Sequence, residues 1–283
     1  MAASVDQVEL LFLGTGTSAG IPMIGCTCAT CTSPDPRDKR TRPSVVISYG
    51  RADGSPADSS PTTRSPADGN RTRVLVDTTP ELRLQCVAHG VDRIDALVYT
   101  HAHADHVMGL DDVRRFNAIK GGPLDVWADA MTFDGLTRCF GYAFKAPSPE
   151  TTLFRPHLVH RDIAATFEIN GVTWTPIRMF HGEMPVLGFR VGNLAYCTDV
   201  SRIPEESFAL LEGLDVLVLD ALQWKKHATH FSVEEAMEVS TRIGAKQTLF
   251  THIAHALRHE ETNRLLPPTM QLAYDGQRVS ASR

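Results

Sequence analysis

Three histidines and one aspartate lie within six residues of one another, directly after a short apolar segment. Residues 94–99 predict a strand buried on both faces, and the run His101-Ala102-His103-Ala104-Asp105-His106 follows them. His101 and His103 are two positions apart and cannot share one face of a helix, so we expect a loop that turns into a helix at Asp105. Neutral imidazoles and a carboxylate are ligands that a borderline divalent cation prefers. The run therefore predicts a metal site at the end of a strand.

A second group of metal-binding side chains lies near the start of the chain. Cys26, Cys28 and Cys31 form a C-x-C-x₂-C cluster, whereas the other three of the six cysteines stand alone. Three thiolates can occupy three corners of a tetrahedral zinc site, and a fourth ligand would have to come from elsewhere. A disulfide framework is not expected, because a chain of this length does not need one for its stability. The alternative to a zinc site is therefore three reduced thiols.

Alternating strand and helix patterns surround these residues. Turn residues and apolar periodicity predict helices at 80–89 and 232–243, the second with Ser232 and Glu235 at the spacing of a capping box. Short apolar runs predict the following strands: 8–13, 44–49, 74–76, 94–99, 173–177, 186–191, 194–197, 216–219 and 248–250. The sum is a mixed α/β fold in which helices cover layered sheets.

Residues 51–73 differ from the rest of the chain. They contain no aliphatic or aromatic side chain larger than alanine and repeat Ser-Pro-Ala-Asp at 55–58 and 65–68. Such a segment buries too little apolar surface to offset its ordering entropy, so we expect a mobile surface insertion between two strands. The alternative is a recognition loop. Because no domain linker is evident, residues 1–283 are predicted to form a single domain.

The composition is that of an ordinary globular protein. The chain has 283 residues, a formal net charge of −5, 42% hydrophobic residues and 22% charged residues. No apolar run approaches the roughly 20 residues that span a bilayer, so no membrane partner is expected. The first residues lack the basic region and cleavage site of a secretory signal, and we therefore expect a cytoplasmic protein. An acidic chain is also a poor candidate for binding nucleic acid through bulk charge.

The motif His-x-His-x-Asp-His at 101–106 resembles the signature of the metallo-β-lactamase fold superfamily. That superfamily has three further ligands downstream, a histidine, an aspartate and a last histidine, each at the end of a strand. This chain has a match at every step, although each match would be weak alone. The matching residues are His181, Asp199 and His252. The resemblance implies a four-layer αββα sandwich of the α/β class.

The same resemblance implies how seven side chains divide between two divalent metal ions. Three histidines would hold one ion, three other side chains would hold the second, and one aspartate would bridge the two. These sets are His101, His103 and His181; Asp105, His106 and His252; and Asp199. The ligand types suit zinc, manganese or iron, so the identity of the ions stays open.

A narrower resemblance concerns the cysteine cluster. The glycine-rich residues 14–20, followed by C-x-C-x₂-C, are similar to the cyclic phosphodiesterases of phosphonate metabolism, which act on phosphoribosyl 1,2-cyclic phosphate. In those enzymes a histidine three residues after the last active-site histidine completes a structural zinc site, which implies this role for His255. The likeness extends from about residue 8 to residue 276. The enzymes of pyrroloquinoline quinone biosynthesis are similar at this cluster too, so the cluster alone identifies no substrate.

The charges at the expected centre favour an anionic ester as substrate. Two divalent cations, two aspartates and a bridging hydroxide sum to about +1, within a chain whose total is −5. Two metal ions can activate a shared water and stabilise both oxygens of an in-line displacement. We therefore expect a dinuclear-metal-dependent hydrolase, a phosphodiesterase that cleaves a small cyclic or strained phosphodiester by attack of a metal-bridging hydroxide. Asp105 is counted among its catalytic residues.

A leaving alkoxide also needs a proton or a charge partner. The segment 225–232 contains His227 and His230, and the resemblance places a catalytic histidine here, at His230 in preference to His227. We expect His230 to protonate the leaving oxygen or to bind the phosphate. The alternative is a surface histidine in a basic turn.

Other functions stay open at this point. The same ligands support a thioester or lactone hydrolase. An RNA-processing nuclease, such as the tRNA 3′-end endonucleases, ranks low because those enzymes use a long basic arm, and the insertion at 51–73 is nearly neutral. A β-lactamase would leave the cysteine cluster and His230 unexplained.

The alternative from another class is a non-catalytic metal- or cofactor-carrier protein related to quinone-cofactor biosynthesis. The complete set of seven ligands disfavours it. The expected partners are a small anionic phosphodiester and, since members of the resembled family often dimerise, a second copy of the chain in a homodimer.

Overall fold

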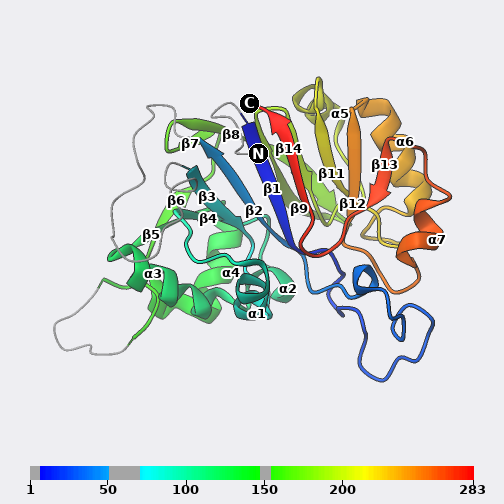
Figure 1. The fold of residues 1–283 in the computed structure, drawn as a ribbon. Coiled ribbons are helices and arrows are strands. Elements are labelled where there is room, and N and C mark those ends of the chain that lie inside the picture. The colour runs from blue at the N-terminus through cyan, green and yellow to red at the C-terminus, as the bar shows by residue number, and fades with distance from the viewer. Residues whose placement is uncertain (1–6, 51–70, 147–153) are drawn as a thin grey trace.

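Two seven-stranded sheets run through the middle of the molecule (Figure 1). The computed structural model describes residues 7–50, 71–146 and 154–283. The first sheet has the strand order β14 (Arg278–Ser282), β1 (Gln7–Gly14), β2 (Ser44–Gly50), β3 (Arg71–Val76), β4 (Ala96–Val98), β5 (Leu124–Ala128) and β6 (Leu158–Asp162). The second has the order β13 (Met270–Leu272), β12 (Gln247–Thr251), β11 (Val216–Asp220), β10 (Leu194–Cys197), β9 (Met184–Val191), β8 (Val172–His181) and β7 (Phe167–Ile169).

Both sheets follow one pairing pattern. In the first, β14 to β3 pair antiparallel and β3 to β6 pair parallel. In the second, β7 to β10 pair antiparallel and β10 to β13 pair parallel. Parallel neighbours require crossover connections, so the carboxyl ends of these strands lead into loops and helices. Both sheets therefore present a row of strand ends from which side chains can project.

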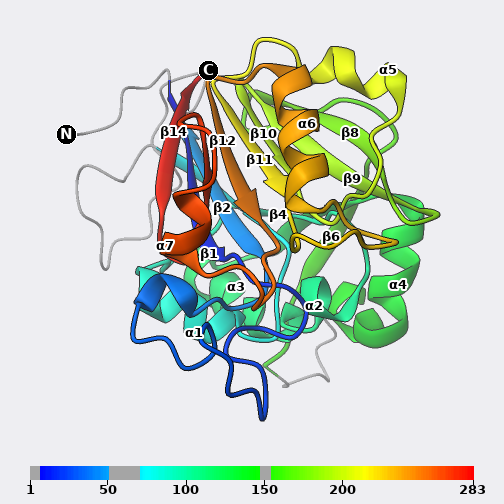
Figure 2. The ribbon, with the colours of Figure 1, turned by 90° about the vertical axis from the view of Figure 1, so that its right-hand side faces the viewer.

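Helices cover the outer faces of both sheets (Figures 1 and 2). Against the first sheet lie α1 (Leu82–His89), α3 (Arg114–Lys120) and α4 (Ala130–Phe140), and against the second lie α5 (Glu205–Phe208) and α6 (Val233–Ile243). The short helices α2 (Ala104–Val107) and α7 (His259–Asn263) follow β4 and β12. A capping box between Ser232 and Glu235 opens α6, as the sequence predicted.

Three apolar clusters fill the three interfaces between these four layers. Strand β1 shows why, because its side chains are apolar on both faces. Leu10 and Phe12 point into the cluster between the sheets, whereas Leu11 and Leu13 point toward the helices that cover the first sheet. The sequence of a strand that is buried on both faces is a continuous apolar run rather than an alternation of apolar and polar residues.

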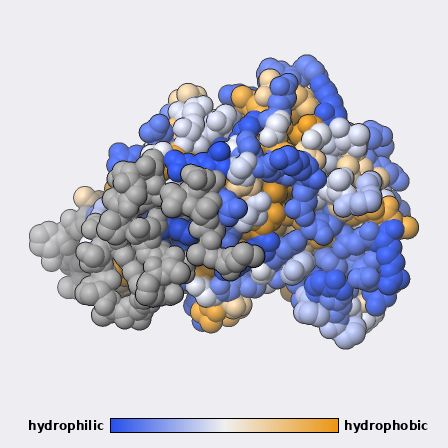
Figure 3. Space-filling model, turned by 45° about the horizontal axis from the view of Figure 1, so that its top comes forward, coloured by the Kyte–Doolittle hydropathy of each residue, from blue (hydrophilic) through white to orange (hydrophobic). Residues whose placement is uncertain are grey.

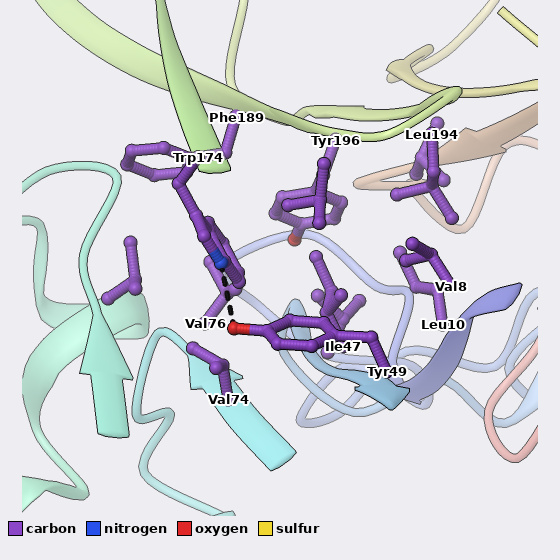
Figure 4. Packing of buried hydrophobic residues seen from close by; sticks show 14 of the residues in the cluster. Val8, Leu10, Ile47, Tyr49, Val74, Val76, Trp174, Phe189, Leu194 and Tyr196 are labelled. Carbon is purple, nitrogen blue, oxygen red and sulfur yellow. Dashed lines mark hydrogen bonds between the residues drawn. The ribbon is translucent and has the colours of Figure 1, made fainter. Parts of the chain in front are cut away.

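The cluster between the sheets also carries a polar contact that links them. Trp174 Nε1 donates a hydrogen bond of 3.0 Å to the hydroxyl of Tyr49, and that hydroxyl lies 3.1 Å from the carbonyl oxygen of Ile169 (Figure 4). Both rings are fully buried. These bonds replace the hydrogen bonds to water that the polar atoms lose on burial. Two large aromatic side chains can therefore fill the centre of the sandwich.

The predicted four-layer αββα sandwich is confirmed. The predicted insertion at 51–73 is wrong at its carboxyl end, because residues 71–73 belong to β3 and pair with β2. These residues alternate between the two faces of the strand, and Thr72 is buried. The rest of that segment, 51–70, lies outside the described residues.

The surface shows the usual mixture of side chains. Figure 3 brings the top of Figure 1 forward and shows mostly hydrophilic residues on the coloured part of this face, with hydrophobic groups between them. Among the described helices, none combines the length and the apolar character that crossing a bilayer requires.

Candidate metal centre and active site

The seven predicted ligands meet at one edge of the sandwich, where strands of both sheets end. The first sheet supplies four of them, from the loop after β4 and from helix α2. The second sheet supplies three, from the last residue of β8 and from the positions after β10 and β12. They are His101, His103, Asp105 and His106, and His181, Asp199 and His252.

Four of these side chains form a buried cluster, and their ligand atoms all lie within 4.8 Å of one another. Asp199 is at its middle: one carboxylate oxygen is 3.2 Å from His106 Nε2, and the other is 3.2 Å from His252 Nε2. Asp105 Oδ2 lies 3.6 Å from His106 Nε2 and 3.7 Å from His252 Nε2. This set contains the three ligands predicted for the second ion together with the predicted bridging aspartate.

The other three histidines gather beside this cluster. The ring centroids of His101 and His103 are 4.6 Å apart, those of His103 and His181 are 5.1 Å apart, and those of His101 and His181 are 5.9 Å apart. Three imidazoles bound to one tetrahedral ion at about 2.1 Å would place their centroids about 5 Å apart. Ligand atoms of Asp199 and His181 also lie within 4.8 Å of each other. Asp199 is therefore placed between the two groups.

The buried nitrogens of these rings indicate what the site can hold. Nε2 of His101, of His106 and of His252 is buried without a hydrogen-bond partner among the described residues. An unpartnered buried polar atom costs about 1–3 kcal/mol and is rare in folded proteins. A divalent cation bound to these nitrogens would remove that penalty. The donor set of imidazoles and carboxylates therefore fits divalent metal ions.

Asp77 orients two of the histidines. Its carboxylate accepts hydrogen bonds from the backbone nitrogen of Thr100 at 2.9 Å, from the Thr100 hydroxyl at 2.8 Å and from His106 Nδ1 at 2.8 Å. The Thr100 hydroxyl also lies 2.9 Å from His101 Nδ1 and, because it donates to Asp77, it accepts from that nitrogen. Hydrogen bonds thus engage Nδ1 of both rings, so Nε2 is in each ring the nitrogen that would bind a metal.

A backbone carbonyl orients His181 in the same way. Its Nδ1 donates to the carbonyl oxygen of Thr229 at 2.6 Å. A Cβ added to Gly182 would lie 3.0 Å from Cγ2 of Thr229, so the segment before α6 packs closely against the end of β8. This contact fixes the ring of His181 relative to the residues 227–230.

The charges of the cluster favour a cation. Burial opposes a charge on His106, yet Asp199 and Asp77 raise the pKa of its imidazole well above the ordinary value. Burial likewise opposes a charge on Asp199, yet His252 and His106 lower the pKa of its carboxyl group well below the ordinary value. Burial opposes a charge on Asp105 too, yet His252 and His106 lower the pKa of its carboxyl group below the ordinary value. The ionised carboxylates of Asp105 and Asp199 therefore create a field that stabilises positive charge, which bound metal ions would supply.

Three residues of the centre have left-handed backbone conformations. The φ angles are +64° at Asp77, +55° at Asp199 and +58° at His252, and each residue lies directly after a strand or one position beyond it. Residues other than glycine rarely adopt this region, and each such residue carries a conformational cost. The sharp turn directs these side chains across the sheet edge toward one another.

The structure separates the two candidate catalytic histidines. His230 is buried, and its ring centroid lies 4.5 Å from that of His181 and 4.5 Å from that of His252. Its Nδ1 donates to Asp220 Oδ2 at 2.6 Å, so Nε2 is the nitrogen available to a substrate. Asp220 is the fully buried last residue of β11 and also accepts from the backbone nitrogen of Val200. His227 is exposed, and its ring centroid lies 5.3 Å from that of His230.

The cysteine cluster forms a second candidate metal site. His255 Nδ1 lies 3.3 Å from Cys26 Sγ, 3.4 Å from Cys28 Sγ and 3.8 Å from Cys31 Sγ. In a tetrahedral site with Zn–S near 2.3 Å and Zn–N near 2.0 Å, these edges would be about 3.6 Å. A hydrogen bond from the backbone nitrogen of Cys31 lowers the pKa of Cys28 to about 6, so its thiolate is present at neutral pH. The four residues therefore fit a zinc ion.

A buried network holds this loop against the segment that follows β12. The guanidinium of Arg40 is fully buried, pairs with Asp38 Oδ1 at 3.2 Å and lies 3.4 Å from the carbonyl oxygen of Ala254. Asp38 also accepts from the backbone nitrogen of His259 at 2.7 Å. The loop and the segment 253–259 therefore behave as one packed unit.

Comparison with known proteins identifies the family. The model of the beta-lactamase superfamily domain matches residues 72–253. The crystal structure of a diphosphatase from the PhnP family is 41% identical and covers 97% of both chains, with a TM-score of 0.83. The chain belongs to the beta-lactamase superfamily and, within it, to the PhnP family. The prediction of a metal-dependent hydrolase is thereby confirmed at the level of the superfamily.

Two relatives of this chain have names other than diphosphatase. An octanoyltransferase of Porphyromonas gingivalis is 34% identical over 272 residues, which are 95% of this chain and 51% of that protein. The chain thus spans about half the length of that relative. Coenzyme PQQ synthesis protein B of Methylorubrum populi is 26% identical over 75% of this chain and 72% of that protein. By its name, this second relative takes part in the synthesis of coenzyme PQQ.

Sequence reasoning missed three residues that position the centre: Asp77, Thr229 and Asp220. Asp77 and Asp220 had a recognisable signal, because each is a carboxylate at the end of an apolar strand, like Asp199. Thr229 had none, since it acts through its backbone carbonyl oxygen.

Proposed function

We propose that this chain hydrolyses a small phosphodiester with the help of two divalent metal ions. His101, His103 and His181 would hold one ion, Asp105, His106 and His252 the other, and Asp199 both. The observation that carries this proposal is the convergence of free, buried Nε2 atoms on two ionised aspartates at one sheet edge. Bound divalent ions would supply a nucleophile from water and neutralise charge on the phosphate.

His230 would give a proton to the leaving oxygen. Asp220 holds its ring through Nδ1, so the proton would leave from Nε2, which is available to a substrate beside His181 and His252. In the overall reaction, a water oxygen forms a new bond to phosphorus and the bond to the leaving oxygen breaks. The leaving oxygen takes the electron pair and the proton. Cys26, Cys28, Cys31 and His255 would hold a structural zinc ion away from this chemistry.

A metal-loaded sample assayed on bis(p-nitrophenyl) phosphate, with its metal content measured, tests the proposal. We expect hydrolysis that disappears when a chelator removes the metals. With a diester of an unactivated alcohol, His230→Ala should lower kcat by about 100-fold or more, because that leaving group needs the acid. With p-nitrophenolate, which leaves without an acid, the effect should be smaller. His157→Ala, a half-buried histidine outside the centre, serves as the control.

The alternatives predict different results in the same experiment. A thioester or lactone hydrolase would be active on its own ester class and inactive on the phosphodiester. A carrier protein would bind metal without hydrolysing either. A diphosphate is the second candidate substrate, because the relative that is 41% identical over nearly the whole chain is named a diphosphatase.

A further inference from the structure

Helix α1 is apolar on the side that faces away from the first sheet as well as on the side that packs against it. Leu82 and Cys86 are buried in the cluster beneath the helix, whereas Leu84 and Val87 are 56% and 73% exposed. Leu84 and Val87 are three residues apart, so they lie side by side on one face of the helix. A helix that is apolar all round is normally covered by protein. The outer face of α1 has no such cover within the described part of the chain.

A groove of about 350 Å³ lies between α1 and α3, beside these exposed side chains. Most of its walls are apolar, and the apolar residues are Leu82, Val87, Val91, Phe116 and Ile119. The groove is far larger than the ~15 Å³ that a single water needs, so side chains of another molecule would fit into it. Apolar walls that stay open to water cost free energy, and burying them against a partner would recover it. The helix face and the groove together therefore indicate a docking surface.

The charges around this groove indicate the kind of partner. Arg83, Arg115 and Asp112 line it and form no ion pair with another described residue. Both arginines are exposed and Asp112 is half-buried, whereas Asp92, which also lines the groove, pairs with Arg73 at 2.9 Å. A partner that carries only one sign of charge would leave the other sign unpaired. A second copy of the chain, related by a two-fold axis, supplies both signs, because each copy offers the same patch to the other.

Both walls of the groove continue from segments that hold the metal centre. Helix α1 follows the strand end that carries Asp77, and α3 follows α2, which carries Asp105 and His106. The backbone nitrogen of Thr78 donates to the carbonyl oxygen of His106 at 2.7 Å, and the backbone nitrogen of Gly109 donates to the carbonyl oxygen of Thr78 at 2.9 Å. A partner that bridges α1 and α3 would therefore also restrain the segments that position His106.

We propose that the groove between α1 and α3 is the site at which a second copy of this chain binds, in a homodimer with two-fold symmetry. In this dimer Leu84 and Val87 of each copy enter the groove of the other, so the same apolar contact forms twice. At the rim, Asp112 of each copy pairs with Arg83 or Arg115 of the other. The inference is independent of the proposed function, because it rests on the outer face of the helices and not on the metal centre.

Sedimentation equilibrium of the full chain over a series of concentrations tests the dimer. We expect the wild type to form a species of twice the 31.1 kDa of one chain. Val87→Glu should raise the dissociation constant of the dimer by at least about 30-fold, because it places a charge in the apolar contact. Leu265→Glu is the matched control, since Leu265 is 69% exposed and lies outside the groove. A wild type that stays monomeric at about 100 μM, or equal effects of the two substitutions, would overturn the proposal.

Charge reversal then tests whether the two rims meet. The first protein carries Arg83→Asp together with Arg115→Asp, and the second carries Asp112→Arg. We expect each to self-associate about 10–100-fold more weakly than the wild type, because like charges face each other across the two-fold axis. An equimolar mixture of the two should form a heterodimer, identified by its mass in native mass spectrometry, with a dissociation constant within about threefold of the wild-type value. Absence of this recovery, while circular dichroism shows that both proteins are folded, would show that these charges do not meet and would overturn the assigned interface.

Discussion

The two candidate metal sites are built in different ways. Ligands of the catalytic centre lie at the ends of strands from both sheets, and neighbouring groups such as Asp77 orient their rings. Ligands of the cysteine site lie mostly on the loop between β1 and β2, and their closest contacts are with one another. Neighbouring groups therefore orient the rings of the first site, whereas the second site lies in a loop that the buried pair of Arg40 and Asp38 holds against the segment 253–259. Variants of each site should fail in different ways.

The largest effect is expected at the middle of the catalytic centre. Asp199→Ala removes the carboxylate that lies 3.2 Å from both His106 and His252. We expect kcat/KM on bis(p-nitrophenyl) phosphate to fall by more than about 10³-fold, because both ions lose a ligand. Circular dichroism should stay unchanged, since the strands hold the site. Asp134→Ala, an exposed aspartate paired with Arg138, is the control. Activity within tenfold of the wild type would contradict a bridging role.

A smaller effect is expected at a residue that contacts a metal ligand and is not itself a ligand. Asp77→Asn keeps the shape of the side chain but removes the charge that fixes the proton of His106 on Nδ1. We expect metal affinity at the centre to fall by about 10–100-fold, measured by competition with a chelator. Asp125→Asn, at an exposed ion pair with Arg161, should leave the affinity unchanged. Unchanged affinity in Asp77→Asn would mean that the backbone alone orients His106.

The cysteine site should show the reverse behaviour. Cys28→Ser removes one of four ligands, so we expect loss of one zinc ion per chain and a fall in Tm of about 5–15 °C. The activity of the remaining folded protein should change by less than about threefold, because the four residues of the cysteine site form a group separate from the cluster around Asp199. Cys139→Ser, at an exposed free cysteine, is the control. A loss of activity as large as that of Asp199→Ala would abolish the distinction between the two sites.

The smallest effect concerns pH. Burial beside Arg37 and Arg40 lowers the pKa of His259 to about 4, below the value of about 6.5 for an unfolded chain. The unfolded chain therefore takes up this proton first, and the stability that is present above pH 6.5 is lost as the pH falls toward 4. Between pH 7 and pH 5 we expect the wild type to lose about 1–2 kcal/mol more than His259→Gln, measured by urea unfolding. Equal losses of stability in both proteins would show that protonation of His259 is not the cause. His157→Gln is the control for the loss of a histidine as such.

Much of the catalytic centre could be predicted from the sequence, because its ligands obey a local rule. Asp199 and His252 each follow a short apolar strand, and their order along the chain completes the motif at 101–106. Asp77 and Asp220 follow the same rule, but nothing in the sequence says toward which neighbour a strand-end carboxylate turns. That depends on the left-handed backbone at Asp77 and on the ring nitrogen that His230 presents.

The fold class could be predicted from the sequence, but the pairing of the strands at the sheet edges could not. Strand β14 pairs with β1 across nearly the whole length of the chain, and its residues alternate without a long apolar run. No local pattern reveals such a pairing. The choice between His227 and His230 likewise required the structure, because only the buried position of Asp220 shows which histidine faces the metals.

The cysteine site also has a consequence for the synthesis of the protein. Cys26 and His255 are 229 positions apart, so the thiolates leave the ribosome long before their histidine partner. At about 5–20 residues per second, that interval is roughly 10–50 s. During this interval the three thiols lack their histidine partner, and they are exposed to oxidation or to binding of a different metal ion. A metal ion at this site would therefore gain its histidine ligand late, when the last strands of the second sheet are synthesised.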